Sequence, residues 1–95
     1  MKIWLDSIRP APLGFIWCKS VNEAKSLIEN TTETLDIVDT NTEAGSFAKD
    51  GGNYINLLLW LEETHRSCAV HIHARKSDVA LCMRAIIIHN EWREI

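Results

Sequence analysis

The sequence is short of positive charge and has no long apolar run. Its 10 lysine and arginine residues are outnumbered by 13 aspartate and glutamate residues, which gives a formal net charge of −3. A surface that neutralises many phosphates needs an excess of positive charge, so we do not expect a nucleic-acid partner. No stretch approaches the roughly 18 apolar residues of a membrane span, and Asp6 comes too early for a signal peptide. We expect a cytoplasmic protein that does not enter a membrane.

Cysteine is also scarce, and its spacing argues against a disulfide framework. Cys18, Cys68 and Cys82 are odd in number and form no CxxC pair. Such thiols are typical of a reducing compartment, where free cysteine behaves as a small apolar residue. We therefore expect buried thiols rather than redox or metal chemistry.

What the sequence does contain is enough for one folded domain. Hydrophobic residues make up 46% of the 95 residues and charged residues 24%, which is typical of globular proteins and not of disordered chains. A chain of this length suits one core. We predict a single domain over residues 1–95, with one functional site.

Short β-rich runs alternate with helical patterns along the chain. Strands are predicted near residues 2–6, 15–18, 35–39 and 69–73. Helices are predicted from Ser20 to the polar turn at 30–32, over 54–63, and from Ser77 to about Asn90. Residues 92–95 are expected to form an edge strand or a tail. This alternation implies a parallel sheet with helices on both faces.

Several polar side chains fall where the predicted strands end. Asp6 follows the first strand, Asp39 ends the third, and His73 ends the fourth. A long polar loop, residues 40–53, follows Asp39. Ligands of such sheets bind at the carboxyl ends of the strands. We therefore expect these residues around one rim, where the site should lie.

Three stretches of the chain resemble a known family. They are KIWLDSIRPAP, the loop EAGSFAKDGGNY leading into LLLWLEE, and VHIHARKSDVALCMRAIIIHNEWREI. Together they cover nearly the whole chain and resemble the cyclic-phosphate processing receiver domains, distant relatives of response-regulator receivers. The resemblance implies a small receiver-like (flavodoxin-like) α/β three-layer sandwich with a parallel four-stranded sheet in the order 2-1-3-4. It also implies clustered acids that would hold a metal ion, and the metal ion would neutralise charge on a phosphate ester during its reaction.

The first and last motifs of that family are incomplete here. Asp6, Arg9 and Pro10 fit the first motif, but Ser7 replaces its second aspartate. On the last strand His71 and His73 fit, and we interpret His71 as a core histidine and His73 as the rim residue. The polar residues expected after them are replaced by Ala74, Arg75 and Lys76.

The central acidic motif has two possible alignments. Without an insertion, Asn41, Thr42 and Glu43 stand where the family has Asp, His and Asp. With a two-residue insertion, Asp39 takes the place of the first acid instead. Either way the motif has lost acids, and the two alignments remain open.

The surviving residues define the candidate sites. A catalytic set would consist of Asp6, Glu43 and His73, with His73 as acid or base. The acids Asp6, Asp39 and Glu43 could hold Mg²⁺ only weakly, because the ligand set is poor, and we expect no resident cofactor. Positive side chains near the rim could bind an anion: Arg9, Arg75 and Lys76.

Two predicted helices carry more apolar residues than one buried face can hide. Residues 57–61 are all apolar, and residues 86–88 are three isoleucines. The outward-facing members could form an interface, for which the candidates are Leu57, Trp60, Leu61, Ile87 and Ile88. Alternatively, the tail around Trp92 covers them.

Lost acids and excess apolar helix surface favour one functional hypothesis over two others. The first is a degenerate receiver-like domain that acts by binding a protein partner or a second copy of itself, without efficient catalysis. The second is a metal-dependent phosphoesterase or cyclic-phosphate processing enzyme. The third is a phage or mobile-element inhibitor that reuses the scaffold.

Overall fold

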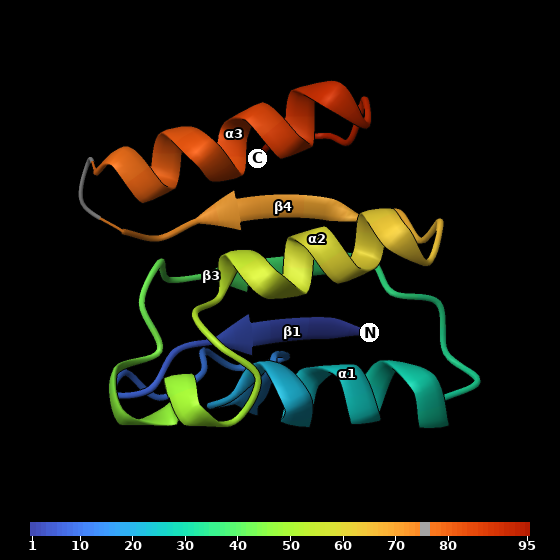
Figure 1. Cartoon of the computed structure of the whole chain (residues 1–95). Coiled ribbons are helices and arrows are strands. Elements are labelled where there is room, and N and C mark those ends of the chain that lie inside the picture. Colours follow the sequence, from blue (N-terminus) through green and yellow to red (C-terminus); the bar gives the residue numbers. More distant parts are fainter. Residues whose placement is uncertain (75–76) are drawn as a thin grey trace.

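The structure, a computed structural model, describes residues 1–74 and 77–95. In chain order the described residues form the following elements (Figure 1): β1 (Lys2–Leu5), β2 (Ile16–Cys18), α1 (Val21–Asn30), β3 (Ile37–Thr40), a short 3₁₀ helix η1 (Gly45–Lys49), α2 (Ile55–Glu63), β4 (Ala69–Ile72) and α3 (Asp78–His89). Each predicted strand and helix is present, with ends that differ by a few residues. No helix in these two ranges is long and apolar enough to cross a membrane.

The sheet is parallel throughout and has the strand order β2-β1-β3-β4. β1 is therefore an inner strand, paired on both sides, although it comes first in the chain. The predicted order is confirmed. The C-terminal residues add one parallel bridge to the outer edge of β4, where the N–H of Val70 donates to the carbonyl of Arg93. The tail is thus a single bridge rather than a full strand.

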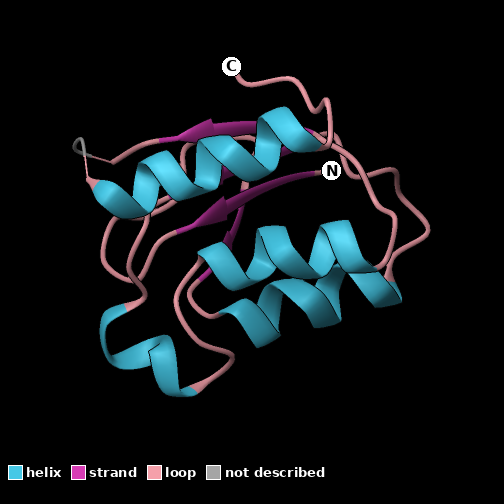
Figure 2. Ribbon diagram, turned by 45° about the horizontal axis from the view of Figure 1, so that its top comes forward, coloured by secondary structure: helices cyan, strands magenta, loops and turns pink. Residues whose placement is uncertain are grey.

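The core lies on one face of the sheet. Alternate strand residues, including Ile3, Val38 and Val70, form one buried cluster with Ala24 of α1 and residues of α2 and α3. In Figure 1, α1 and α2 pass in front of the strands, and in Figure 2 they lie side by side. α1 and α2 follow strands that progress in the same direction across the sheet, and right-handed crossovers in one direction place their helices on the same face.

The other face of the sheet carries a loop where we expected helices. Residues 6–15, which join β1 to β2, contain both prolines of the chain and form no helix. The loop is tied to this face because the Trp4 indole N–H donates to the carbonyl of Arg9 (2.8 Å) and the Trp17 indole N–H donates to the carbonyl of Asp6 (2.7 Å). Between this loop and β4 the face stays partly open.

The N-terminus of α1 is fixed by its own cap and by the loop after η1. The Ser20 hydroxyl accepts from the N–H of Glu23 and donates to Asp50, and the carbonyl of Asp50 accepts from the N–H of Asn22. Gly51, which follows with φ +109°, lies directly against the first turn of the helix. The predicted Ser20 cap is confirmed, as is that of Ser77 on α3, whose hydroxyl accepts from the N–H of Ala80.

The burial pattern corrects the predicted interface. Leu57, Leu61 and Ile87 are core residues with essentially no exposed surface, so they cannot take part in an interface. α2 packs between α1 and α3, so more than one side of this helix is covered. Trp60 is half-buried, with the Arg66 guanidinium 4.7 Å from its ring centroid. Ile88 is exposed.

The three thiols do not share one environment. Cys18 is buried and Cys68 half-buried, and this burial raises the pKa of each thiol to about 12. Both are therefore protonated and unreactive near neutral pH. Cys82 is exposed on α3, which corrects the expectation that all three pack inside.

Candidate functional site

The strand register brings three polar residues to one level at the carboxyl edge of the sheet. Leu5 pairs with Thr40, and Thr40 pairs with Ile72. The next residues along are therefore Asp6, Asn41 and His73, and the Asn41 amide lies 3.3 Å from Asp6 Oδ2. Asp39 lies two residues back within β3, on the same side of the sheet. The register thus places Asn41 level with Asp6, and Asp39 one step further back on the same face.

The His73 imidazole lies between two carboxylates. Its Nε2 is 2.9 Å from Asp6 Oδ2 and its Nδ1 is 2.6 Å from Asp39 Oδ1. The ring stacks on the Trp4 indole, with centroids 3.8 Å apart and planes 3° from parallel. Only 9% of the His73 side chain is exposed. Hydrogen bonds at both ends and stacking on one face hold the ring in a single orientation.

The protons of this assembly can be counted from its geometry. An ionised carboxylate only accepts hydrogen bonds, and a neutral imidazole donates from one nitrogen alone. Both bonds can form with both acids ionised only if His73 is an imidazolium. If the ring is neutral, one acid must keep its proton. The environment of Asp6 indicates whether Asp6 is the acid that keeps a proton.

Asp6 is held in its ionised form. Burial on its own would raise the pKa of Asp6, but hydrogen bonds from the backbone N–H groups of Ile8 (2.8 Å) and Arg9 (2.9 Å), and from His73 and Asn41, lower it below its usual value. Asp6 therefore accepts from His73 Nε2–H. Its bonds to Ile8 and Arg9 also start the β1–β2 loop in a fixed turn.

His71 extends the same network to the surface. Its Nδ1 is 3.0 Å from Asp39 Oδ1, the oxygen that also contacts His73. The side chain is 46% exposed, which corrects our interpretation of His71 as a core residue. Among the described residues its Nε2 has no hydrogen-bond partner. Asp39 thus orients an imidazole whose second nitrogen faces outward.

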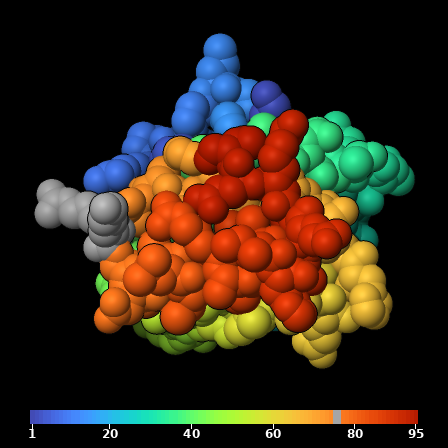
Figure 3. Space-filling view, turned by 90° about the horizontal axis from the view of Figure 1, so that it is seen from above, coloured from blue at the N-terminus to red at the C-terminus, as the bar shows by residue number. Residues whose placement is uncertain are grey.

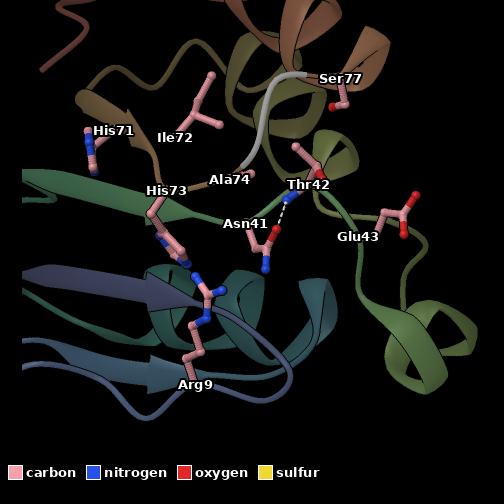
Figure 4. A pocket seen from close by; sticks show the side chains of 9 residues that line it. All are labelled: Arg9, Asn41, Thr42, Glu43, His71, Ile72, His73, Ala74 and Ser77. Atoms are coloured by element: carbon pink, nitrogen blue, oxygen red, sulfur yellow. Dashed lines mark hydrogen bonds between the residues drawn. The ribbon is translucent and has the colours of Figure 1, made fainter.

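An open hollow of about 730 Å³ lies over this network. Figure 4 shows its lining side chains, which are Arg9, Asn41, Thr42, Glu43, His71, Ile72, His73, Ala74 and Ser77. Of the predicted catalytic set, the structure brings Asp6 and His73 together. Glu43 is exposed on the loop after β3, and its carboxylate points away from His73. Of the predicted anion-binding residues, Arg9 lines the hollow, whereas Arg75 and Lys76 lie outside the described residues.

The arrangement does not fit a magnesium ion. Mg²⁺ needs oxygen ligands at about 2.0–2.1 Å, and an imidazole ring stands between the carboxylates of Asp6 and Asp39. Glu43 lies apart from both. Within residues 1–74 and 77–95, no three His, Cys, Asp or Glu side chains are placed to hold a metal ion together.

Sequence reasoning missed two parts of the site. It did not foresee that Asp39 bonds to both histidines, or that Trp4 stacks on His73. The available signal was the period of two in strands, which places Trp4 on the same face as Asp6 and Asp39 on the same face as Asn41. Strand order 2-1-3-4 would then have set them side by side.

Comparison with known proteins identifies a family. The family model described as cyclic-phosphate processing receiver domain matches residues 1–88. No curated protein and no solved structure matches the chain.

Proposed function

This chain belongs to the family of cyclic-phosphate processing receiver domains, and from that premise we propose that it is a receiver-like module that acts by protein association, without metal-dependent chemistry. The proposal that the domain works without metal-dependent chemistry rests on the His73 ring, which lies between Asp6 and Asp39 and contacts the oxygens that a metal ion would need. The proposal that it acts by protein association is supported by the outer surface of α3.

The outer side of α3 presents an apolar stripe. Leu81, Ala85 and Ile88 are spaced like one helical face, and all three are exposed, Leu81 at 63% and Ile88 at 73%. The Arg84–Glu94 ion pair (2.9 Å) ties the C-terminal tail to α3, and Figure 3 shows both forming one continuous surface. Covering a leucine or isoleucine side chain contributes about 1.5–3 kcal/mol before the entropy of association is subtracted.

We expect the variant Ile88→Glu to weaken self-association at least about tenfold, because a charge in a desolvated apolar contact costs more than 1.4 kcal/mol. Light scattering coupled to size-exclusion chromatography, over a range of concentrations, measures this. Leu13→Glu is the matched control, since Leu13 is a fully exposed apolar residue in the β1–β2 loop, away from α3. A wild-type chain that stays monomeric at several hundred micromolar, or equal effects of both variants, would contradict self-association through this stripe.

A second candidate function is favoured by His71. Asp39 holds its Nδ1 and leaves Nε2 facing outward at the hollow, which is how a general acid–base histidine is presented. In hydrolysis of a cyclic phosphate ester, His71 would take a proton from the attacking water and return it to the alkoxide released when the P–O bond breaks. The test is hydrolysis of a 2′,3′-cyclic nucleotide in EDTA. Turnover that is lost in His71→Ala would favour this function, and no turnover would exclude it.

A further inference from the structure

We infer that the apolar stripe of α3 in one copy of the chain docks on the open face of the sheet in a second copy. The stripe consists of Leu81, Ala85 and Ile88, and the open face is the side of the sheet opposite the helices. It rests on the proposed function, association through α3, and names the surface that the stripe contacts.

The three helices of the chain all cover the same face of the sheet. The connections from β2 to β3, from β3 to β4 and from β4 to the C-terminal bridge progress in one direction, and right-handed crossovers then place α1, α2 and α3 on one side. Met83 and Ile87 of α3 accordingly join Val38 and Val70 in the core cluster. Sheets made only of parallel strands are almost always covered on both faces. This sheet therefore has a face that the chain itself leaves incompletely covered.

The strand register identifies apolar side chains on the open face. Val38 and Val70 pair with each other and belong to the core, so Ile37 and Ala69, which precede them, point to the opposite side. By the same alternation Ile95 lies on this side, because the tail bridge pairs the residue before it with Val70. Ile37 is half-buried and Ile95 is 47% exposed. Apolar side chains thus lie between the β1–β2 loop and the C-terminal tail.

The stripe and the open face match in size and in kind. At a rise of about 1.5 Å per residue, the stripe from Leu81 to Ile88 is about 10 Å long. The four-residue strands β3 and β4 are about 13 Å long. A helix lying on a sheet is also how the chain covers its other face. Because the stripe points away from the core and the open face is beyond the sheet, the two surfaces of one copy do not meet, and a second copy is needed.

Exposed charges of opposite sign border the two surfaces. Lys2, Arg9 and Arg93 are exposed around the open face, and none has a carboxylate partner among the described residues. Asp78 begins α3 and Glu91 follows its end, and both are exposed. A twofold contact between two α3 helices would set these acids against each other, whereas docking on the open face sets them against the positive side chains. Charge complementarity therefore favours the open face as the partner surface.

The test is complementation between two variants that each lack one surface. Ile88→Glu disrupts the stripe and keeps the open face, whereas Ile37→Glu disrupts the open face and keeps the stripe. Each variant alone should associate at least about tenfold more weakly than wild type, because a charge enters an apolar contact. An equimolar mixture should form a heterodimer of twice the monomer mass and nothing larger. Wild type should exceed the dimer mass as its concentration rises, since every docked pair retains a free stripe and a free face.

Ile16→Glu is the matched control, and light scattering at several hundred micromolar is the measurement. Ile16 is a strand residue with 42% exposure, and its pairing with Ile3 places it on the helix-covered face. This variant should associate like wild type. Circular dichroism checks the fold of Ile37→Glu. If that variant does not fold, Ile95→Glu takes its place, because Ile95 is exposed on the same face.

Three results would overturn the inference. The first is a folded open-face variant that associates as strongly as wild type, and the second is a mixture that stays at the monomer mass. In either case, wild-type association that Ile88→Glu alone abolishes would leave the proposed function standing, with two stripes in contact. The third is a wild-type chain that stays monomeric, which would overturn the proposed association as well.

Discussion

Replacing Asp6 with alanine is expected to lower the free energy of unfolding by about 3–5 kcal/mol, the usual cost of leaving a buried ion without its partner. The Asp6 carboxylate accepts from the backbone N–H groups of Ile8 and Arg9 and from the side chains of Asn41 and His73. Its removal takes a charged acceptor away from these four donors, at a position where the Asp6 side chain is only 2% exposed, and leaves His73 with one carboxylate instead of two. Urea denaturation at pH 7 measures the loss.

Asp36→Ala is the control for this substitution. Asp36 also makes a short ion pair, 2.6 Å from the N-terminal amine, but its side chain is 56% exposed. An exposed pair of this kind contributes only about 0–1 kcal/mol. If Asp6→Ala costs no more than Asp36→Ala, the buried network does not stabilise the fold in the way we describe.

The lowered pKa of Asp6 also predicts the direction of an acid effect. A carboxyl whose pKa is lower in the folded than in the unfolded chain stabilises the fold above its unfolded value, here 3.8. That stabilisation is lost as the pH falls from 3.8 through the folded pKa. We expect the stability of the wild-type chain to fall in this window and that of Asp6→Asn to fall less. Parallel slopes from pH 5 to pH 2, measured by urea denaturation, would contradict this.

Gly51→Ala is expected to destabilise the fold by about 2–5 kcal/mol, from backbone strain and overpacking together. Gly51 has φ +109°, a conformation that L-residues rarely adopt. A Cβ there would lie 2.9 Å from the Val21 Cβ and 2.7 Å from the Asn22 side-chain oxygen. Val21 is a fully buried residue in the first turn of α1, so it cannot move aside without shifting the helix.

Gly14→Ala separates strain from overpacking. Gly14 also has a positive φ, +90°, but a Cβ there would meet no atom within 4 Å. Its cost should be the conformational strain alone, about 1–2 kcal/mol. Thermal or chemical denaturation of the two variants then gives the packing contribution by difference. Equal losses would mean that the contact between the loop and α1 is looser than the structure has it.

Much of the fold could be predicted because its signals are local. The strands are short apolar runs, and the serines that cap α1 and α3 use side-chain oxygens that accept from backbone N–H groups only three residues further along the chain. The strand order came from the family resemblance. The prediction of helices on both faces was wrong, although the order 2-1-3-4 and right-handed crossovers together require α1 and α2 to share a face.

The candidate site was harder to predict because it depends on contacts far apart in the sequence. His73 and Asp39 are 34 residues apart, and His73 and Asp6 are 67 apart. The sequence indicates that these residues share a rim, but not that a histidine lies between the acids rather than beside them. The excess of apolar residues in α2 was misread for a similar reason. α2 is flanked by α1 and α3, so its apolar positions are covered on more than one side.

The inner position of β1 has a consequence for how the chain is made. The first strand of this domain to be synthesised needs neighbours on both edges, and one of them, β3, is not complete until residue 40 has been synthesised. Until then β1 can pair only with the three-residue strand β2, and its other edge is open to any extended segment nearby. During the interval between the synthesis of β1 and that of β3, this open edge can pair with a strand of another chain, which is a route to aggregation.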